Sequence, residues 1–301
     1  MADSSHQFGG PWTEQKLGIL RKYLSAYTTA LSKQPFKTAY VDAFAGTGYR
    51  QGRGDTRQLG LEEILPIREF LDGSARVALQ CEPAFDRYVF IEKHRARCQE
   101  LEKLKSDFPD KAIKISIALA DANDHIQMMC NKRWEKRRAV LFLDPYGMEV
   151  RWQTIEAIAK TKAIDLWVLF PLSGVNRMLT RSGKIPLEWK HRLNELFGTT
   201  GWYEHFYKRR TSHSLFNEKI DEVVKVSTQV ISDYFLTRLR ECFAGVNPTP
   251  AVLYSSRNSP LYLFCFAAGN PRGAPIALKI ASDILRWDRK DHGERFKHRV
   301  D

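Results

Sequence analysis

Cysteine is scarce in this sequence, and no two cysteines stand close together. The five are Cys81, Cys98, Cys130, Cys242 and Cys265. Because their number is odd and none forms a Cys-x-x-Cys pair, the sequence predicts neither a disulfide framework nor a zinc site. We expect reduced cysteines with structural roles and no metal centre.

Long apolar runs are also missing. The longest, such as residues 166–170, are far shorter than the roughly 20 residues that a membrane-spanning helix needs. Residues 1–7 contain neither the basic segment nor the apolar segment of a secretion signal. We therefore expect a cytoplasmic protein with no membrane partner.

Acidic residues are outnumbered by basic ones. The chain has 47 Lys and Arg against 35 Asp and Glu, which gives a net charge of +12 and a pI near 9.5. A basic excess of this size favours a polyanionic partner. Nucleic acid is the partner that we expect.

The apolar pattern predicts a helix followed by alternating strands and helices. Leucine and tyrosine recur at spacings of three and four from Leu17 to Leu31, which predicts an amphipathic helix over 13–32. Strands are expected at 38–44, 87–92, 113–119, 139–143 and 163–170. Because helices separate these strands, they should pair in parallel through crossovers.

The remaining segments show other patterns. Residues 50–57 read as a loop that is either solvated or close to a phosphate. A helix with Ser74 as its N-cap is expected over 74–82. An aromatic and basic segment after residue 172 either contacts substrate or forms a helical insertion with its own small core. A helix over 220–243, a hairpin of 251–254 with 261–266, and a helix over 274–287 with a frayed or solvated tail should follow.

The predicted fold class is α/β, with a doubly wound, mostly parallel sheet and a terminal antiparallel hairpin. This arrangement resembles the class I methyltransferase fold. The expected organisation is a helical extension (1–36), a Rossmann-like core (37–172) with a loop insertion (49–72), a helical insertion (173–215), and a C-terminal part (216–301) that completes the core.

A strand that runs into a glycine turn is the first candidate ligand site. It carries Asp42, Phe44, Gly46 and Gly48. Glycines let the backbone turn sharply and let a ligand approach closely. A D-x-F-x-G-x-G strand end is common in methyltransferases that use S-adenosylmethionine. A dinucleotide fingerprint needs a third glycine where this chain has Gln51, which disfavours a nicotinamide cofactor.

Acids also follow the second and third predicted strands. Glu92 ends the apolar run 88–92, where its carboxylate can accept both ribose hydroxyls. Asp121, next to Ala122, follows the third strand, where it can accept the adenine amino group. A single acid here is more often an exposed strand end than a ligand. Three acids after three successive strands favour a site, because open α/β sheets bind ligands at their carboxyl edge.

The motif Asp144-Pro145-Tyr146-Gly147, directly after the run 139–143, is the candidate catalytic corner. Asp144 and the Pro145 carbonyl can accept the two N–H groups of a planar amine, while Tyr146 stacks on its ring. The alternative is a simple turn after a strand. A single proline precedes the tyrosine, unlike the Asp-Pro-Pro-Tyr motif of adenine-N6 methyltransferases. The target base therefore stays open.

Four blocks together resemble the three-Cys-motif partner (TcmP) family. They are residues 12–24, residues 40–48, Gly73-Ser74 with 90–92, and residues 142–147 with Trp152. The usual proline after the Gly-Ser pair is Ala75 here. The resemblance implies a methyltransferase-like protein and a partner, a three-Cys-motif protein of radical-enzyme type.

Three functions fit these observations. The first is an S-adenosylmethionine-dependent methyltransferase that modifies an exocyclic amine of a nucleobase in RNA or DNA. The second is a non-catalytic, methyltransferase-like protein that binds nucleic acid as the partner of a radical-type enzyme. The third is a methyltransferase that acts on a small molecule or a protein. A cytosine-C5 mechanism has no candidate nucleophile, because no Pro-Cys dipeptide occurs.

Overall fold

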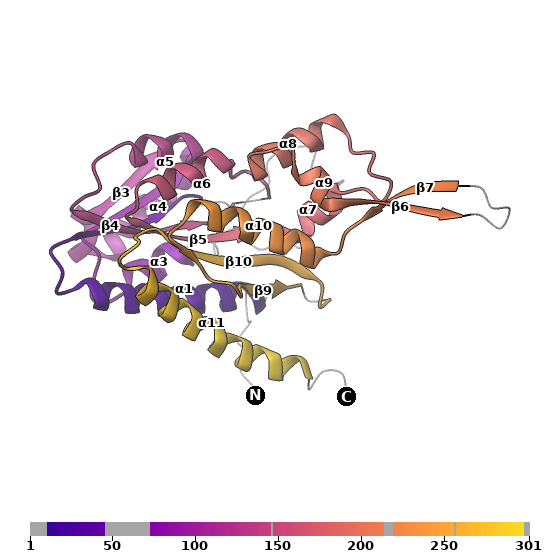
Figure 1. Ribbon diagram of the computed structural model, residues 1–301. Helices are drawn as coiled ribbons and strands as arrows, with labels where there is room; N and C mark the ends of the chain where they lie inside the picture. Colours follow the sequence, from indigo (N-terminus) through magenta and orange to yellow (C-terminus); the bar gives the residue numbers. More distant parts are fainter. Residues whose placement is uncertain (1–10, 46–72, 146, 214–218, 256, 298–301) are drawn as a thin grey trace, which may run out of the picture.

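The computed structural model describes residues 11–45, 73–145, 147–213, 219–255 and 257–297, and these form a mixed sheet with helices on both faces (Figure 1). The strand order is β3-β2-β1-β4-β5-β10-β8, and β9 pairs with the outer part of β10. The strands are β1 (Lys37–Asp42), β2 (Arg87–Glu92), β3 (Ile115–Leu119), β4 (Arg137–Leu143), β5 (Ile164–Phe170), β8 (Gly245–Val246), β9 (Ala251–Tyr254) and β10 (Pro260–Ala268).

Pairing in the sheet follows the predicted class. Strands β1 to β5 pair in parallel, and β10 runs antiparallel to both β5 and β9. The order reverses between β1 and β4, which is where open α/β sheets bind ligands. The fold is therefore α/β and class I methyltransferase-like, as the alternation of strands and helices predicted.

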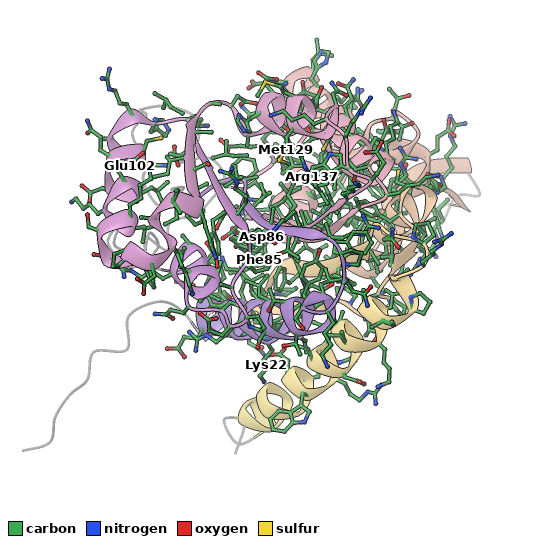
Figure 2. The ribbon with its side chains drawn as sticks, turned by 90° about the vertical axis from the view of Figure 1, so that its left-hand side faces the viewer. Lys22, Phe85, Asp86, Glu102, Met129 and Arg137 are labelled. Carbon is green, nitrogen blue, oxygen red and sulfur yellow. The ribbon has the colours of Figure 1, made fainter. Side chains whose placement is uncertain are left out.

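Two helical layers cover the sheet and bury one apolar cluster each. One layer contains α1 (Pro11–Leu31), α3 (Ser74–Leu79), α4 (Arg95–Asp107) and α11 (Ala274–Lys297). The other contains α5 (Ala122–Cys130), α6 (Trp152–Lys160), α7 (Leu172–Met178), α8 (Leu187–Phe197), α9 (Trp202–Phe206) and α10 (Thr228–Cys242). Figure 2 shows Lys22 of α1 and Met129 of α5 on opposite sides of the molecule. A short 3₁₀ helix, η2 (Pro109–Lys114), precedes β3.

Helix α1 packs along its predicted apolar face. Its side chains Leu20, Tyr23, Leu24 and Tyr27 are buried against the sheet. The Tyr23 hydroxyl donates a hydrogen bond of 2.8 Å to Asp165 near the start of β5. This face therefore fixes α1 along the strands, with its first turns toward their carboxyl ends.

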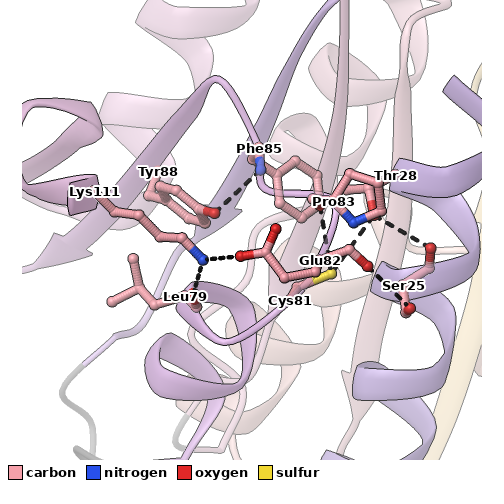
Figure 3. A network of polar contacts seen from close by, with 9 residues as sticks. All are labelled: Ser25, Thr28, Leu79, Cys81, Glu82, Pro83, Phe85, Tyr88 and Lys111. Atoms are coloured by element: carbon pink, nitrogen blue, oxygen red, sulfur yellow. Dashed lines mark hydrogen bonds and ion pairs between the residues drawn. The ribbon is translucent and has the colours of Figure 1, made fainter. Parts of the chain in front are cut away.

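Polar contacts hold α1 to the turn between α3 and β2 (Figure 3). Ser25 donates to the Glu82 carbonyl, and the Thr28 hydroxyl lies 3.6 Å from the sulfur of Cys81. Lys111 donates to the Leu79 carbonyl and to the Glu82 carboxylate, at 2.6 and 2.7 Å. The amino end of β2 is thereby tied to the helices of the same layer.

The predicted helix over 220–243 is wrong in its first part. Strand β7 (Lys219–Lys225) pairs antiparallel with β6 (Tyr207–His213), and α10 begins only at Thr228. The β-branched pair Val223 and Val224 favours the strand. The β6–β7 hairpin projects from the main body (Figure 1), so the segment 173–215 is not wholly helical.

The aromatic residues of this segment do not form a separate core. Trp202, Phe206 and Tyr207 are buried in the main cluster with Phe170 of β5 and Phe197 of α8. The predicted small core is therefore wrong, because these rings complete the face of the sheet covered by α5 and α6.

Two helix ends differ from the prediction. Gly73, and not Ser74, is the N-cap of α3, and it makes no side-chain cap bond. Helix α11 continues to Lys297, through most of the predicted frayed tail, since its Arg, Lys and Glu residues favour helix. The loop insertion 49–72 lies outside the described residues. No helix in the described ranges combines the length and apolarity needed to cross a membrane.

Candidate active site

Four acids lie at the carboxyl edge of adjacent parallel strands. Asp42 and Glu92 are the last residues of β1 and β2, Asp121 follows β3, and Asp144 follows β4. In the order of the sheet they read Asp121, Glu92, Asp42 and Asp144. The parallel pairing therefore brings the predicted acids to one edge.

A cavity of about 450 Å³ opens at this edge. Phe44, Glu92, Asp121 and Ala122 line it, together with Gly147 after the candidate corner. Asp42 and Asp144 do not line it. Gly46, Gly48 and Tyr146 lie outside the described residues. The structure thus groups four of the predicted cofactor residues around one space.

Glu92 has the clearest ligand-binding geometry. Its side chain is 2% exposed, and Oε1 accepts the His94 backbone N–H at 2.7 Å. Oε2 has no hydrogen-bond partner in the described part of the chain, and Arg97 Nη1 lies 3.6 Å from it. The ion pair with Arg97 offsets part of the cost of burying this oxygen, and a hydrogen bond from a ligand would offset more. A sugar hydroxyl at the cavity wall fits this oxygen.

Backbone contacts set Phe44 and Asp121 beside Glu92. Ala45 donates its N–H to the Ile91 carbonyl at 3.0 Å, which holds the chain after β1 against the end of β2. Asp121 is the N-cap of α5, and its Oδ1 accepts from the N–H groups of Asn123 and Asp124. The predicted adenine acceptor therefore also has a structural role, and any ligand bond would use its other oxygen.

Asn123 fixes the loop after the candidate corner, and it was not predicted from the sequence. Its buried side chain donates to the Glu149 carbonyl and accepts from the Arg151 N–H, each at 2.9 Å. It also accepts from the Thr154 hydroxyl at 2.8 Å. The residue therefore joins the start of α5 to the cavity wall at 147–151.

Asp144 is paired with a buried cation. The Lys16 ammonium of α1 donates to Asp144 Oδ2, and Lys16 is 1% exposed. The same ammonium lies 5.2 Å from the ring centre of Trp12 and 5.7 Å from that of Phe142. Pro145 is buried beside Asp144. The candidate corner is thus a neutral ion pair covered by α1, and not an isolated carboxylate.

A signal for Lys16 was present in the sequence. Lys16, Leu20, Tyr23, Leu24 and Tyr27 follow helical spacing, so the lysine shares the apolar face. A lysine in that position needs an acid partner, because buried lysines are almost always paired. Its partner could not be read, since it stands 128 residues away.

Asp42 is buried behind the cavity wall. Its Oδ2 accepts from the Tyr40 hydroxyl at 3.3 Å, while Oδ1 has no hydrogen-bond partner among the described residues. Burial raises the pKa of Asp42 from its ordinary 3.8 to about 7, against the lowering effect of a hydrogen bond from Ser74. The charge of Asp144 raises this pKa and that of Lys16 lowers it.

Asp42→Asn should change how stability depends on pH. Below about pH 4, Asp42 is protonated in both the folded and the unfolded chain. Between about pH 4 and the folded pKa of about 7 the unfolded chain gives up the proton first, so stability is lost as pH rises. The variant avoids this loss, and its advantage should grow to on the order of 4 kcal/mol by pH 8.

Urea unfolding from pH 4 to pH 8, without ligand, measures the difference. The exposed Asp110 provides the control, and Asp110→Asn should follow the native chain at every pH. Parallel curves for Asp42→Asn and the native chain would contradict the assignment.

The other half of the cavity is built from elements after β5. Ser173, Gly174 and Met178 of α7 line it, with Arg192 of α8 and Tyr262 of β10. The Tyr262 ring lies 5.6 Å from that of Trp12. The helical segment after residue 172 therefore contributes a wall to the cavity, which favours substrate contact for it.

Comparison with known proteins gives similarity at the level of the fold. No family model and no curated protein matches the sequence. A Legionella pneumophila protein of family DUF519 is 18% identical with a TM-score of 0.39, over 77% of this chain and 94% of that chain. Spermidine synthase from Thermotoga maritima is 8% identical with a TM-score of 0.39, over 87% and 60%.

A third similar structure is precorrin-6y C5,15-methyltransferase from Geobacter metallireducens. It is 9% identical with a TM-score of 0.29, over 81% of this chain and 86% of that chain. Identities this low say nothing of substrate, so the strand order described above carries the assignment of a methyltransferase-like fold.

Proposed function

We propose that this protein is an S-adenosylmethionine-dependent methyltransferase. The observation that carries the proposal is the cavity at the carboxyl edge, where Glu92 presents a buried oxygen without a hydrogen bond beside Phe44, Asp121 and Ala122. Glu92 would hold the ribose, Phe44 would contact the adenosine, and Asp121 would accept the adenine amine. S-Adenosylmethionine, when bound, supplies an electrophilic methyl group on a sulfonium.

The proposed acceptor is an exocyclic amine of a nucleobase in RNA or DNA. The lone pair of such an amine is delocalised into its ring, so the site must localise it and align it. Asp144 and the Pro145 carbonyl would accept its N–H groups, while Tyr146 stacks on the base. The net charge of +12 supports a polyanionic substrate.

The Lys16–Asp144 pair suits this chemistry. Methyl transfer moves the positive charge from the sulfonium to the amine nitrogen, which then gives up a proton, so an acceptor that holds the amine lies where the charge develops. Lys16 offsets the charge of Asp144 while the carboxylate keeps acceptor lone pairs for an amine. The corner would then align the amine through hydrogen bonds to Asp144.

The same pair favours one alternative function. If Lys16 occupies Asp144 permanently, the chain would keep the fold without turnover and bind nucleic acid as the partner of a radical-type enzyme. The sequence resemblance to three-Cys-motif partner proteins motivates this second proposal and the cytoplasmic location that goes with it. Salt-sensitive nucleic-acid binding without any methyl transfer would support it.

Labelled methyl transfer distinguishes the two functions. The purified chain is incubated with methyl-labelled S-adenosylmethionine and total RNA or total DNA, and the nucleic acid is digested to nucleosides. Labelled N6-methyladenosine or N2-methylguanosine would support the methyltransferase proposal and would identify the target base. If calorimetry on the folded protein detects no binding of S-adenosylmethionine, the first proposal fails.

Glu92→Gln should weaken S-adenosylmethionine binding about tenfold or more, because hydrogen bonds to a charged acceptor contribute about 1.5–3 kcal/mol. Isothermal calorimetry gives the affinity. Glu100→Gln is the matched control, since Glu100 is exposed on α4 and pairs only with Lys103 in the described contacts. Equal losses in the two variants would mean that Glu92 does not hold the ligand.

A further inference from the structure

The guanidinium of Arg177 on α7 is partly buried and has no counter-ion in the described part of the chain. Its Nε and one Nη are inaccessible and have no hydrogen-bond partner, and no ion pair to Arg177 occurs among the described residues. Burial lowers the pKa of Arg177, while the nearby Tyr262 hydroxyl raises it. Because arginine stays charged in proteins, two nitrogens of this cation have lost water without gaining a partner among the described residues.

Arg177 lies beside the half of the cavity that the predicted cofactor residues do not line. Ser173 and Gly174, which line the cavity, precede Arg177 by four and three residues and therefore share its side of α7. Met178 and Tyr262 line the same wall. The guanidinium is thus next to the space where a substrate would lie.

Basic side chains also occur on the elements around α7. Arg192 also lines the cavity. Lys225 of β7 donates to the Asn176 carbonyl, and its pKa is lowered by burial and by the charge of Arg181. Of the acids nearby, Glu188 is paired with Arg192, and Glu195 lines the cavity. Arg192 is thus offset by Glu188, whereas Arg177 has no ion pair among the described residues. An anion is the ligand that such a guanidinium favours.

We infer that Arg177 binds a phosphate of the nucleic-acid backbone next to the target base. The guanidinium presents its N–H groups in a planar fork that matches phosphate oxygens. The identity of the phosphate as nucleic acid rests on the proposed function, whereas the anion site rests on the unpaired guanidinium alone.

The carboxylate of S-adenosylmethionine is the competing anion, and the sheet geometry disfavours it. Arg177 follows β5, and Glu92 ends β2, three strands away in the order β2-β1-β4-β5. At about 4.8 Å per strand the ends of β2 and β5 are roughly 14 Å apart, and Arg177 lies beyond the end of β5 on α7. A phosphate of the bound substrate fits this separation better than the carboxylate of an S-adenosylmethionine whose ribose is held by Glu92.

Arg177→Leu tests the site without needing turnover. Without ligand, the variant should unfold at the same temperature as the native chain or higher, because it removes a partly buried charge with two nitrogens that lack a partner among the described residues. Inorganic phosphate should raise the unfolding temperature of the native chain and not that of the variant. A single-stranded oligonucleotide should bind the variant roughly tenfold more weakly, with a salt slope smaller by about one.

Arg137→Leu is the matched control, since Arg137 is exposed at the start of β4, at the opposite edge of the sheet. It should bind phosphate and oligonucleotide like the native chain. S-Adenosylmethionine affinity should be equal in all three proteins, and its loss in Arg177→Leu alone would overturn the inference in favour of the cofactor carboxylate.

The outcomes also separate the inference from the proposed function. If phosphate protects the native chain only, and no oligonucleotide binds or is methylated, the anion site stands and the nucleic-acid function fails. If Arg177→Leu matches the native chain with both probes, the inference fails, whether or not methyl transfer is found.

Discussion

Lys16→Met should lower the free energy of unfolding by about 3–5 kcal/mol, the usual cost of removing one partner from a buried ion pair. The substitution keeps a long apolar side chain against Trp12 and Phe142. It leaves the buried carboxylate of Asp144 without the ammonium that donates to it. The loss therefore comes from the charge and not from a cavity, and urea unfolding at pH 7 measures it.

Two further variants isolate this effect. Lys22→Met changes an exposed lysine of the same helix and should cost less than about 0.5 kcal/mol. The double variant Lys16→Met with Asp144→Asn removes both charges and should recover most of the loss. A Lys16→Met protein as stable as Lys22→Met would show that the ion pair contributes nothing.

The sheet could be predicted from the sequence because its strands are short apolar runs separated by helical patterns. The predicted bounds of β2 are those observed, and the hairpin at 251–254 and 261–266 corresponds to β9 and β10. The β6–β7 hairpin could not be predicted in this way, because its strands are charged and pair with each other outside the main sheet. The local spacing of apolar residues does not indicate such a pairing.

For the candidate site, the sequence predicted only the edge of the sheet at which it lies. Parallel strands place their carboxyl ends together, which was enough to bring Glu92 and Asp121 to one cavity. That Asp42 and Asp144 lie behind the wall depends on how α1 packs. Arg177 gave no signal, because an unpaired arginine is recognisable only when its surroundings are known.

Helix α1 donates a hydrogen bond to a buried aspartate at the carboxyl ends of the strands and to another at their amino ends. Lys16 reaches Asp144 after β4, and Tyr23, two turns later, reaches Asp165 at the start of β5. Both aspartates are buried, and both are held by a side chain from one face of α1. They differ in place, since only Asp144 lies at the carboxyl edge, so the proposed catalytic role predicts an effect on turnover for Asp144 and not for Asp165.

Asp144→Asn should reduce methyl transfer by about 10²–10³-fold, the usual effect of removing one group that acts on the transition state. The amide keeps the size and one acceptor oxygen, but it presents N–H groups to the amine in place of a carboxylate oxygen. S-Adenosylmethionine affinity should stay unchanged, because Asp144 does not line the cavity with Glu92 and Asp121. kcat on the labelled substrate and calorimetry of the ligand give the two readouts.

Asp165→Asn is the matched control, a buried aspartate on a neighbouring strand that also contacts α1. It should lose stability through its bonds to Tyr23 and the Gly269 N–H, with kcat unchanged below its unfolding temperature. If both variants lost the same fraction of kcat, the effect of Asp144 would come from the fold. A loss confined to Asp144→Asn, with ligand affinity retained, would assign the amine to the Asp144–Lys16 corner.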